Sequence, residues 1–208
     1  MDRIIAWVTN HGHMDIEWYQ PLDTFRCWIG EALEMLMELA RENGTQSYIL
    51  DGAFFPLEEA LALHPEYEEA LRALVRDRRL LVGPFYTQFD EFLNAGETIV
   101  ENCLYGDRLS RAFGGGMKAG YLPDNFGHPS QLPQIFRDFG IDNLLFTRGM
   151  PDTPQGTKEF RFVATTAASS MASTSPITPP SPSTTTMIPC PTSRRSSPTR
   201  NTASPITR

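Results

Sequence analysis

Two imidazoles, a carboxylate and an indole lie close together in the segment HGHMDIEW at residues 11–18. Side chains two residues apart in an extended backbone point to the same side, so His11, His13 and Asp15 could face one point. Nitrogen and oxygen ligands in that arrangement suit a borderline divalent ion, zinc first among them. The alternative is a histidine pair with only a structural role, because an H-x-H pair also occurs by chance.

A short apolar run, residues 4–8, comes directly before this segment and is typical of a buried strand. Apolar periodicity and turn residues predict four more strands and five helices after it. These strands cover residues 47–50, 80–82, 118–122 and 143–146, and the helices cover residues 23–43, 57–63, 65–78, 97–113 and 130–139. Alternating strands and helices indicate parallel βαβ units. The expected fold is therefore α/β, a barrel or a doubly wound sheet with parallel strands.

Further charged side chains follow the later predicted strands. Asp90, Asp124 and Arg148 come after the third, fourth and fifth strands in turn. In α/β folds, ligands bind at the carboxyl ends of the strands, so these groups are expected at the same face as the histidine segment. Each has a structural alternative: either Asp could start a turn or cap a helix, and Arg148 could be a surface cation.

Composition limits the classes of partner. Residues 1–162 carry 14 basic and 25 acidic side chains, a charge of −11, and the remaining four arginines bring the chain to −7. Such an acidic domain argues against a nucleic-acid surface, which needs clustered Lys and Arg. No apolar run approaches the 18 residues of a membrane span, and no export leader is recognisable. A cytoplasmic protein is expected.

The last 46 residues, 163–208, differ from the rest of the chain. They contain 21 Ser or Thr and 8 Pro, with no Gly, aromatic, Asp, Glu, Lys or His. Such a segment is not expected to bury a core, so we expect a globular part over 1–162 and a disordered tail over 163–208. The abrupt change suggests a frameshift after residue 162. The competing interpretation is a genuine mucin-like or linker tail.

The sequence resembles glycoside hydrolase family 38, in the N-terminal catalytic domain of its α-mannosidases, and within it the bacterial branch that includes mannosylglycerate hydrolase. The resemblance covers roughly residues 4–150. It is carried by HGHMDIEW at 11–18, GPFYTQFDEF at 83–92 and GYLPDNFGHPSQLP at 120–133. Members of this family have a seven-stranded β/α barrel with zinc at the strand ends. The resemblance therefore implies an incomplete barrel of that type, with Zn²⁺ as the cofactor.

The resemblance also implies roles for single residues. His13 and Asp15 would be zinc ligands, and Asp124 would be both a ligand and the catalytic nucleophile. Trp18 would stack beneath the sugar ring of an α-mannoside substrate. Arg148 would steady the carboxylate of the nucleophile or the substrate.

Two more residues take supporting roles by the same resemblance. His11 would lie outside the zinc ligands and orient the site by hydrogen bonding, and Asp90 would support substrate binding. His128 belongs to the matching motif without a clear assignment. The family draws its fourth zinc ligand, a histidine, and its acid/base carboxylate from sequence well beyond the first 208 residues.

The leading functional hypothesis is therefore a zinc-dependent retaining α-mannosidase, present as an N-terminal portion with impaired catalysis. A metal-dependent carbohydrate deacetylase is a second hypothesis, because zinc-bound water could attack an amide with Asp124 as general base. A third is a non-catalytic, incomplete fragment whose unpaired strand edges favour association. A homo-oligomer is left open, and neither nucleic acid nor membrane is an expected partner.

Overall fold

A computed structural model describes residues 9–16, 18–41, 47–149, 159–164 and 169–174. The elements in chain order are β1 (Asn10–Gly12), α1 (Leu22–Arg41), β2 (Tyr48–Leu50), α2 (Phe55–Leu63), the 3₁₀ helix η1 (Pro65–Tyr67), α3 (Glu68–Arg76), β3 (Leu80–Leu81), α4 (Gly96–Phe113), β4 (Gly120–Leu122), α5 (Leu132–Asp138), β5 (Asn143–Phe146), β6 (Glu159–Val163) and β7 (Ser169–Thr174). The predicted first strand, residues 4–8, lies outside the described residues. The expected alternation of strands and helices is present from β2 to β5.

The described strands form two sheets, and most of their pairs are parallel. One sheet has the order β1-β2-β3, and both of its pairs are parallel. The other has the order β4-β5-β7-β6, in which only the β6–β7 pair is antiparallel. The backbone N–H of Met117, before β4, donates to the carbonyl of Val82, after β3, at 2.8 Å. This hydrogen bond links the two sheets, and side chains that follow β1 and β4 lie close together.

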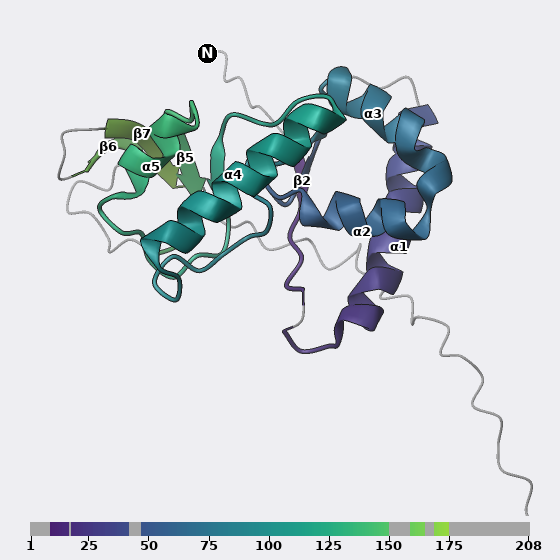
Figure 1. The fold of residues 1–208 in the computed structure, drawn as a ribbon, viewed down its shortest axis with the longest axis horizontal. Helices are drawn as coiled ribbons and strands as arrows, with labels where there is room; N and C mark the ends of the chain where they lie inside the picture. The colour runs from purple at the N-terminus through teal and green to yellow at the C-terminus, as the bar shows by residue number, and fades with distance from the viewer. Residues whose placement is uncertain (1–8, 17, 42–46, 150–158, 165–168, 175–208) are drawn as a thin grey trace, which may run out of the picture.

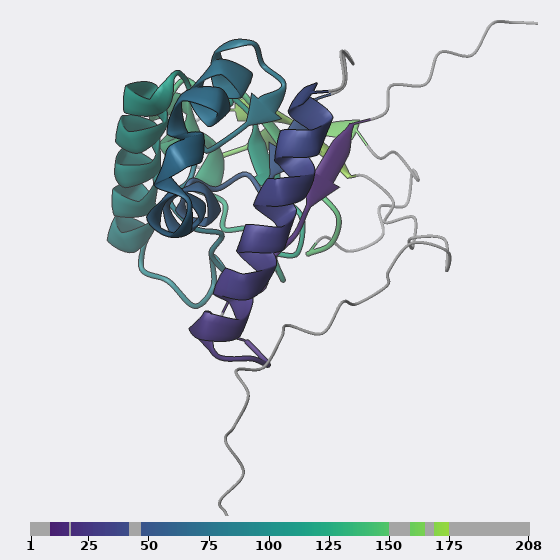
Figure 2. The same ribbon diagram turned by 90° about the vertical axis from the view of Figure 1, so that its right-hand side faces the viewer.

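Helices cover these sheets with two apolar cores beneath them (Figures 1 and 2). In Figure 1, α1, α2 and α3 gather at one end of the molecule, α5 and the β4-β5-β7-β6 sheet lie at the other, and α4 runs between. The first core lies between α1 to α3 and strands β2 and β3. Buried side chains of α1 recur at three- and four-residue spacing and form its inner face: Phe25, Ile29, Leu33, Leu36 and Met37. The second core joins α5, β4 and β5.

Strand β7 corrects the prediction for the Ser/Thr/Pro-rich segment. Disorder from residue 163 is wrong for β7, which pairs with β5 on one side and with β6 on the other. Backbone hydrogen bonds make this possible without large side chains, and the small Ser170 and Ala172 are each 2% exposed. Residues 175–208 lie outside the described residues, and a boundary at residue 162 stays a prediction.

Helix length and polarity also bear on membrane insertion. Among the helices that the structure describes, none combines the length and the apolar character that crossing a bilayer requires.

Candidate metal and catalytic site

The loops that follow β1 and β4 bring one imidazole and two carboxylates together. His13 and Asp15 lie just beyond Gly12, the last residue of β1, and Asp124 lies two residues beyond β4. The Nε2 atom of His13 is 3.3 Å from Asp15 Oδ1 and 3.8 Å from Asp124 Oδ2. One ligand atom from each residue lies within 4.8 Å of the others. The three side chains are between 27% and 39% exposed, so the cluster is open to solvent.

A buried aspartate orients the imidazole of this cluster. Asp51 follows β2 and adopts a left-handed backbone conformation, φ 50°, as does the next residue, Gly52, φ 62°. This turn directs the Asp51 carboxylate inward, where it is 2% exposed. Its Oδ1 lies 2.8 Å from His13 Nδ1, and its Oδ2 accepts from the Met14 N–H at 3.3 Å. With Nδ1 bonded to Asp51, the Nε2 of His13 is left to face the other two carboxylates.

The electrostatics of this arrangement favour a cation. The hydrogen bond to Asp51 raises the pKa of His13, although burial opposes it. Burial raises the pKa of Asp51 in turn, against the lowering effect of His13. Three carboxylates thus surround one imidazole, and a divalent ion would offset their repulsion. An imidazole nitrogen held from behind by a carboxylate, with carboxylate oxygens beside it, is a donor set that fits zinc.

Arg148, beyond the end of β5, holds the Asp124 carboxylate. Its Nη2 lies 2.6 Å from Asp124 Oδ1, and its Nε donates to the Asp124 carbonyl at 2.9 Å. The guanidinium also lies over the Phe126 ring, 3.9 Å from the centroid. One carboxylate oxygen of Asp124 is therefore fixed by Arg148, and the other is directed toward His13.

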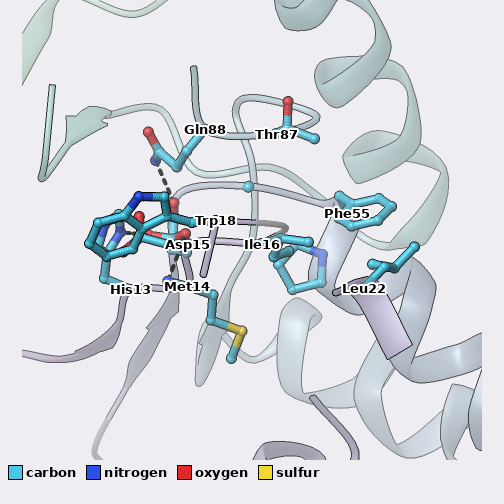
Figure 3. Close-up of a pocket in the computed structure, with 12 residues that line it drawn as sticks. His13, Met14, Asp15, Ile16, Trp18, Leu22, Phe55, Thr87 and Gln88 are labelled. Atoms are coloured by element: carbon cyan, nitrogen blue, oxygen red, sulfur yellow. Dashed lines mark hydrogen bonds and ion pairs between the residues drawn. The ribbon is translucent and has the colours of Figure 1, made fainter. Parts of the chain in front are cut away.

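A hollow of about 440 Å³ lies beside the cluster (Figure 3). His13, Asp15 and Trp18 lie at one end of it in Figure 3, and Leu22 and Phe55 lie at the other. The Trp18 indole is 74% exposed. An exposed indole beside a polar cluster leaves an aromatic face open to an apolar ligand surface, as the implied stacking on a sugar requires.

Two predicted residues lie outside the cluster of His13, Asp15 and Asp124, and the orienting role of one of them, His11, stays a prediction. The Nδ1 atom of His11 is 2.8 Å from the hydroxyl oxygen of Tyr121, so His11 does not join His13 and Asp15 as the alternation predicted. The described strand ends at Gly12, and the alternation of side chains does not extend past it. Asp90 accepts from the Phe92 N–H at 3.4 Å in a turn, and the residues that line the hollow do not include it. Its part in substrate binding stays a prediction.

Sequence reasoning missed Asp51 and Tyr121 as contributors to this site. A signal was available for Asp51, because it directly follows the predicted strand 47–50, the position that singled out the other acidic residues. Tyr121 lies inside β4 and gave no such signal. Gln88 connects the turn after β2 with β4, since its Nε2 donates to the carbonyls of Asp51, at 2.5 Å, and Tyr121, at 3.0 Å.

A match to a family model assigns this chain to one class of protein, the glycoside hydrolases. Residues 3–160 match the family described as "Glycosyl hydrolases family 38 N-terminal domain". The chain belongs to this family.

Relatives and solved structures agree with that assignment. A provisionally named mannosylglycerate hydrolase from Halalkalibacterium halodurans is 37% identical over 153 residues, which are 73% of this chain and 17% of the relative. Alpha-mannosidase G from Dictyostelium discoideum is 28% identical over 67% of this chain and 13% of the relative. The crystal structure of an alpha-mannosidase from Enterococcus faecalis V583 superposes with a TM-score of 0.76 at 28% identity, over 80% of this chain and 19% of that one. The chain thus spans less than a fifth of the length of each of these proteins.

Proposed function

We propose that this chain carries the metal-binding and nucleophile portion of a zinc-dependent retaining α-mannosidase. One observation carries the proposal: the Nε2 of His13 faces Asp15 and Asp124 while Asp51 holds Nδ1. That arrangement places three side chains that could bind zinc beyond the strand ends of a family 38 chain. Zinc there would supply Lewis-acid binding of neighbouring sugar hydroxyls.

Asp124 has the surroundings that a nucleophile needs. Arg148 binds Oδ1 at 2.6 Å, which fixes the rotation of the carboxylate. The other oxygen can then attack the anomeric carbon as the glycosidic bond breaks and the aglycone leaves through its oxygen. Water later hydrolyses the resulting glycosyl-enzyme ester. Trp18 would lie under the apolar face of the sugar during this attack.

The proposed site needs partners from further along a complete protein. By the family resemblance, the fourth zinc ligand and the carboxylic acid that protonates the leaving oxygen come from later sequence. General acid catalysis contributes about 10² to 10⁴ in rate. This chain should therefore act, if at all, on substrates with good leaving groups. In the complete protein, the strands described here would form part of a seven-stranded barrel.

Carbohydrate deacetylation and a purely non-catalytic fragment are less well supported. The relatives whose names state an activity are named for mannosides or mannosylglycerate, and none of the three reported above is named for amide hydrolysis. A homo-oligomer and a cytoplasmic location stay predictions.

Zinc titration of the 208-residue chain by calorimetry tests the metal site. We expect one Zn²⁺ per chain, and at least about a hundredfold weaker binding in the Asp124→Asn variant, since a ligand is lost. Asp142→Asn is the matched control, because Asp142 is an exposed aspartate that accepts from the side-chain amide of its neighbour Asn143 at 3.1 Å. Equal affinity of the wild type and Asp124→Asn would contradict the assignment.

Turnover of an aryl α-mannoside tests the nucleophile. An aryl oxide derived from an acidic phenol leaves without protonation, so the first step, in which the glycosyl-enzyme forms and the phenol is released, does not depend on the missing acid. We expect slow release of the aryl alcohol by the wild type and by Asp142→Asn, and none by Asp124→Asn. Retained release by Asp124→Asn would end the nucleophile assignment.

A further inference from the structure

Glu91 and His128 form a buried ion pair beside the site, and the proposed chemistry uses neither of them. Both side chains are fully buried, and His128 Nδ1 lies 3.0 Å from Glu91 Oε1. Glu91 comes from the loop after β3 and His128 from the loop after β4. The His128 ring also packs against Phe146 of β5, with a centroid distance of 4.1 Å. The pair therefore joins three strand ends.

The remaining bonds of this pair reach both sides of Asp124. Glu91 Oε2 accepts from the side-chain amide of Asn125, the residue directly after Asp124, at 2.6 Å. His128 Nε2 lies 3.0 Å from the backbone carbonyl of Arg148. A carbonyl can only accept, so His128 Nε2 donates to Arg148, while Nδ1 faces Glu91.

Arg148 transmits this contact to Asp124. Its carbonyl is bound by His128, while its guanidinium binds Asp124 Oδ1 at 2.6 Å. The next residue, Gly149, has a φ of 89°, and a Cβ there would lie 3.0 Å from His128 Nε2. The backbone after β5 therefore approaches the imidazole closely, and the approach relies on a glycine.

We propose that Glu91 and His128 are a positioning pair, which fixes the Arg148 backbone so that its guanidinium holds the Asp124 carboxylate toward His13. The inference rests on the proposed role of Asp124. A buried ion pair is poor evidence for stability, because removing two charges from water offsets much of their attraction. Fixed geometry at a reacting carboxylate is a better reason for such a pair, since small displacements there are costly to rate.

Two substitutions of His128 separate positioning from stability. The amide of His128→Asn can replace Nδ1, so it keeps the Glu91 bond and loses the Arg148 bond. The amide of His128→Gln can replace Nε2, so it keeps the Arg148 bond and leaves the Glu91 charge short of a partner. We expect His128→Gln to be the less stable variant in urea, because an unpaired buried charge is the more costly defect.

The two measurements that report positioning, trypsin cleavage and zinc affinity, should change more in His128→Asn than in His128→Gln. In His128→Asn, we expect trypsin to cut after Arg148 about tenfold faster than in the wild type, relative to the cut after Arg111 in α4, because the hydrogen bond that holds the Arg148 carbonyl is lost. We also expect zinc to bind about tenfold more weakly, the scale for lost outer contacts. His128→Gln should show the smaller change in both measurements.

The outcomes decide the inference separately from the proposed function. The positioning role is wrong if cleavage and zinc affinity change more in the less stable variant, His128→Gln, than in His128→Asn. It is also wrong if His128→Asn matches the wild type in both measurements. Should the wild type bind no zinc, the proposed metal site fails, and cleavage after Arg148 still decides the positioning role. Should His128→Gln not fold, the comparison of His128→Asn with the wild type decides it.

Discussion

Replacing Asp51 by asparagine should weaken zinc binding without unfolding the chain. The carboxylate accepts two bonds, from His13 Nδ1 and from the Met14 N–H. An amide has only one acceptor oxygen, so it can serve one of these donors and must turn its NH₂ toward the other. If the NH₂ turns toward His13, it favours the tautomer with the proton on Nε2, which cannot bind a metal. In either orientation the ligand loses support.

The size of the effect follows from these contacts. Loss of an outer-shell carboxylate on a metal-binding histidine raises the dissociation constant about 10- to 100-fold. Burial already raises the pKa of Asp51, so its charge is costly to keep, and a neutral amide avoids that cost. We therefore expect the metal-free stability to change by no more than about 1 kcal/mol. At zinc concentrations near 100 times the wild-type dissociation constant, the stabilisation by zinc should fall from about 2.7 to about 1.4 kcal/mol for a tenfold loss.

Calorimetric titration gives the dissociation constant, and urea unfolding with and without zinc gives the two stabilities. Asp142→Asn is again the control, since it removes one negative charge from an exposed position. A dissociation constant for Asp51→Asn within about twofold of the wild type would refute the orienting role, given the size expected for such contacts. An equal loss of zinc affinity in Asp142→Asn would show that zinc binding responds to the net charge of the chain.

Three further predictions test the fold and the aromatic face. The ammonium of Lys118 and the guanidinium of Arg111 on α4 lower the pKa of Asp107, although burial opposes them. Asp107→Asn should therefore lower the free energy of unfolding by about 0.5 to 1 kcal/mol at pH 7. Urea titrations should find that this difference from the wild type disappears as the pH falls below about 4. Gly106→Ala should cost at least about 2 kcal/mol in the same assay, because its Cβ would overlap the backbone after β3, whereas Gly96→Ala, with open space, should stay within about 0.5 kcal/mol. Trp18→Ala should leave stability within about 0.5 kcal/mol of wild type, since the indole is exposed, and should weaken binding of methyl α-mannoside measured by calorimetry.

The elements that local pattern determines were predicted well. Apolar periodicity and glycine stops predicted a helix over 97–113 and a strand over 143–146. The structure has α4 at Gly96–Phe113, within one residue of that prediction, and β5 at Asn143–Phe146 as predicted. Gly114, with φ 142°, follows α4 where the pattern predicted its end. These features depend on residues close in sequence. Composition misled the prediction for β7, because strand pairing uses backbone groups that even a Ser- and Thr-rich segment has.

The site was predicted only in part, for a related reason. The position of Asp124 after a strand is a local feature, and it put this residue at the same face as the histidine segment. The partner of His13 is not local: Asp51 lies 38 residues away. Its inward direction depends on a left-handed turn at Asp51 itself, which composition and periodicity do not reveal.

The same distinction explains why the Glu91–His128 pair has no signature in the sequence. Its two members lie 37 residues apart, and the carbonyl that His128 binds belongs to a residue 20 positions further on. A strand-end site draws each of its groups from a different loop, so the contacts that fix their geometry must cross between loops. Reading strand ends therefore finds the groups that face a ligand, such as His13 and Asp124. The groups behind them, which set where those side chains point, become visible only once the fold brings the loops together.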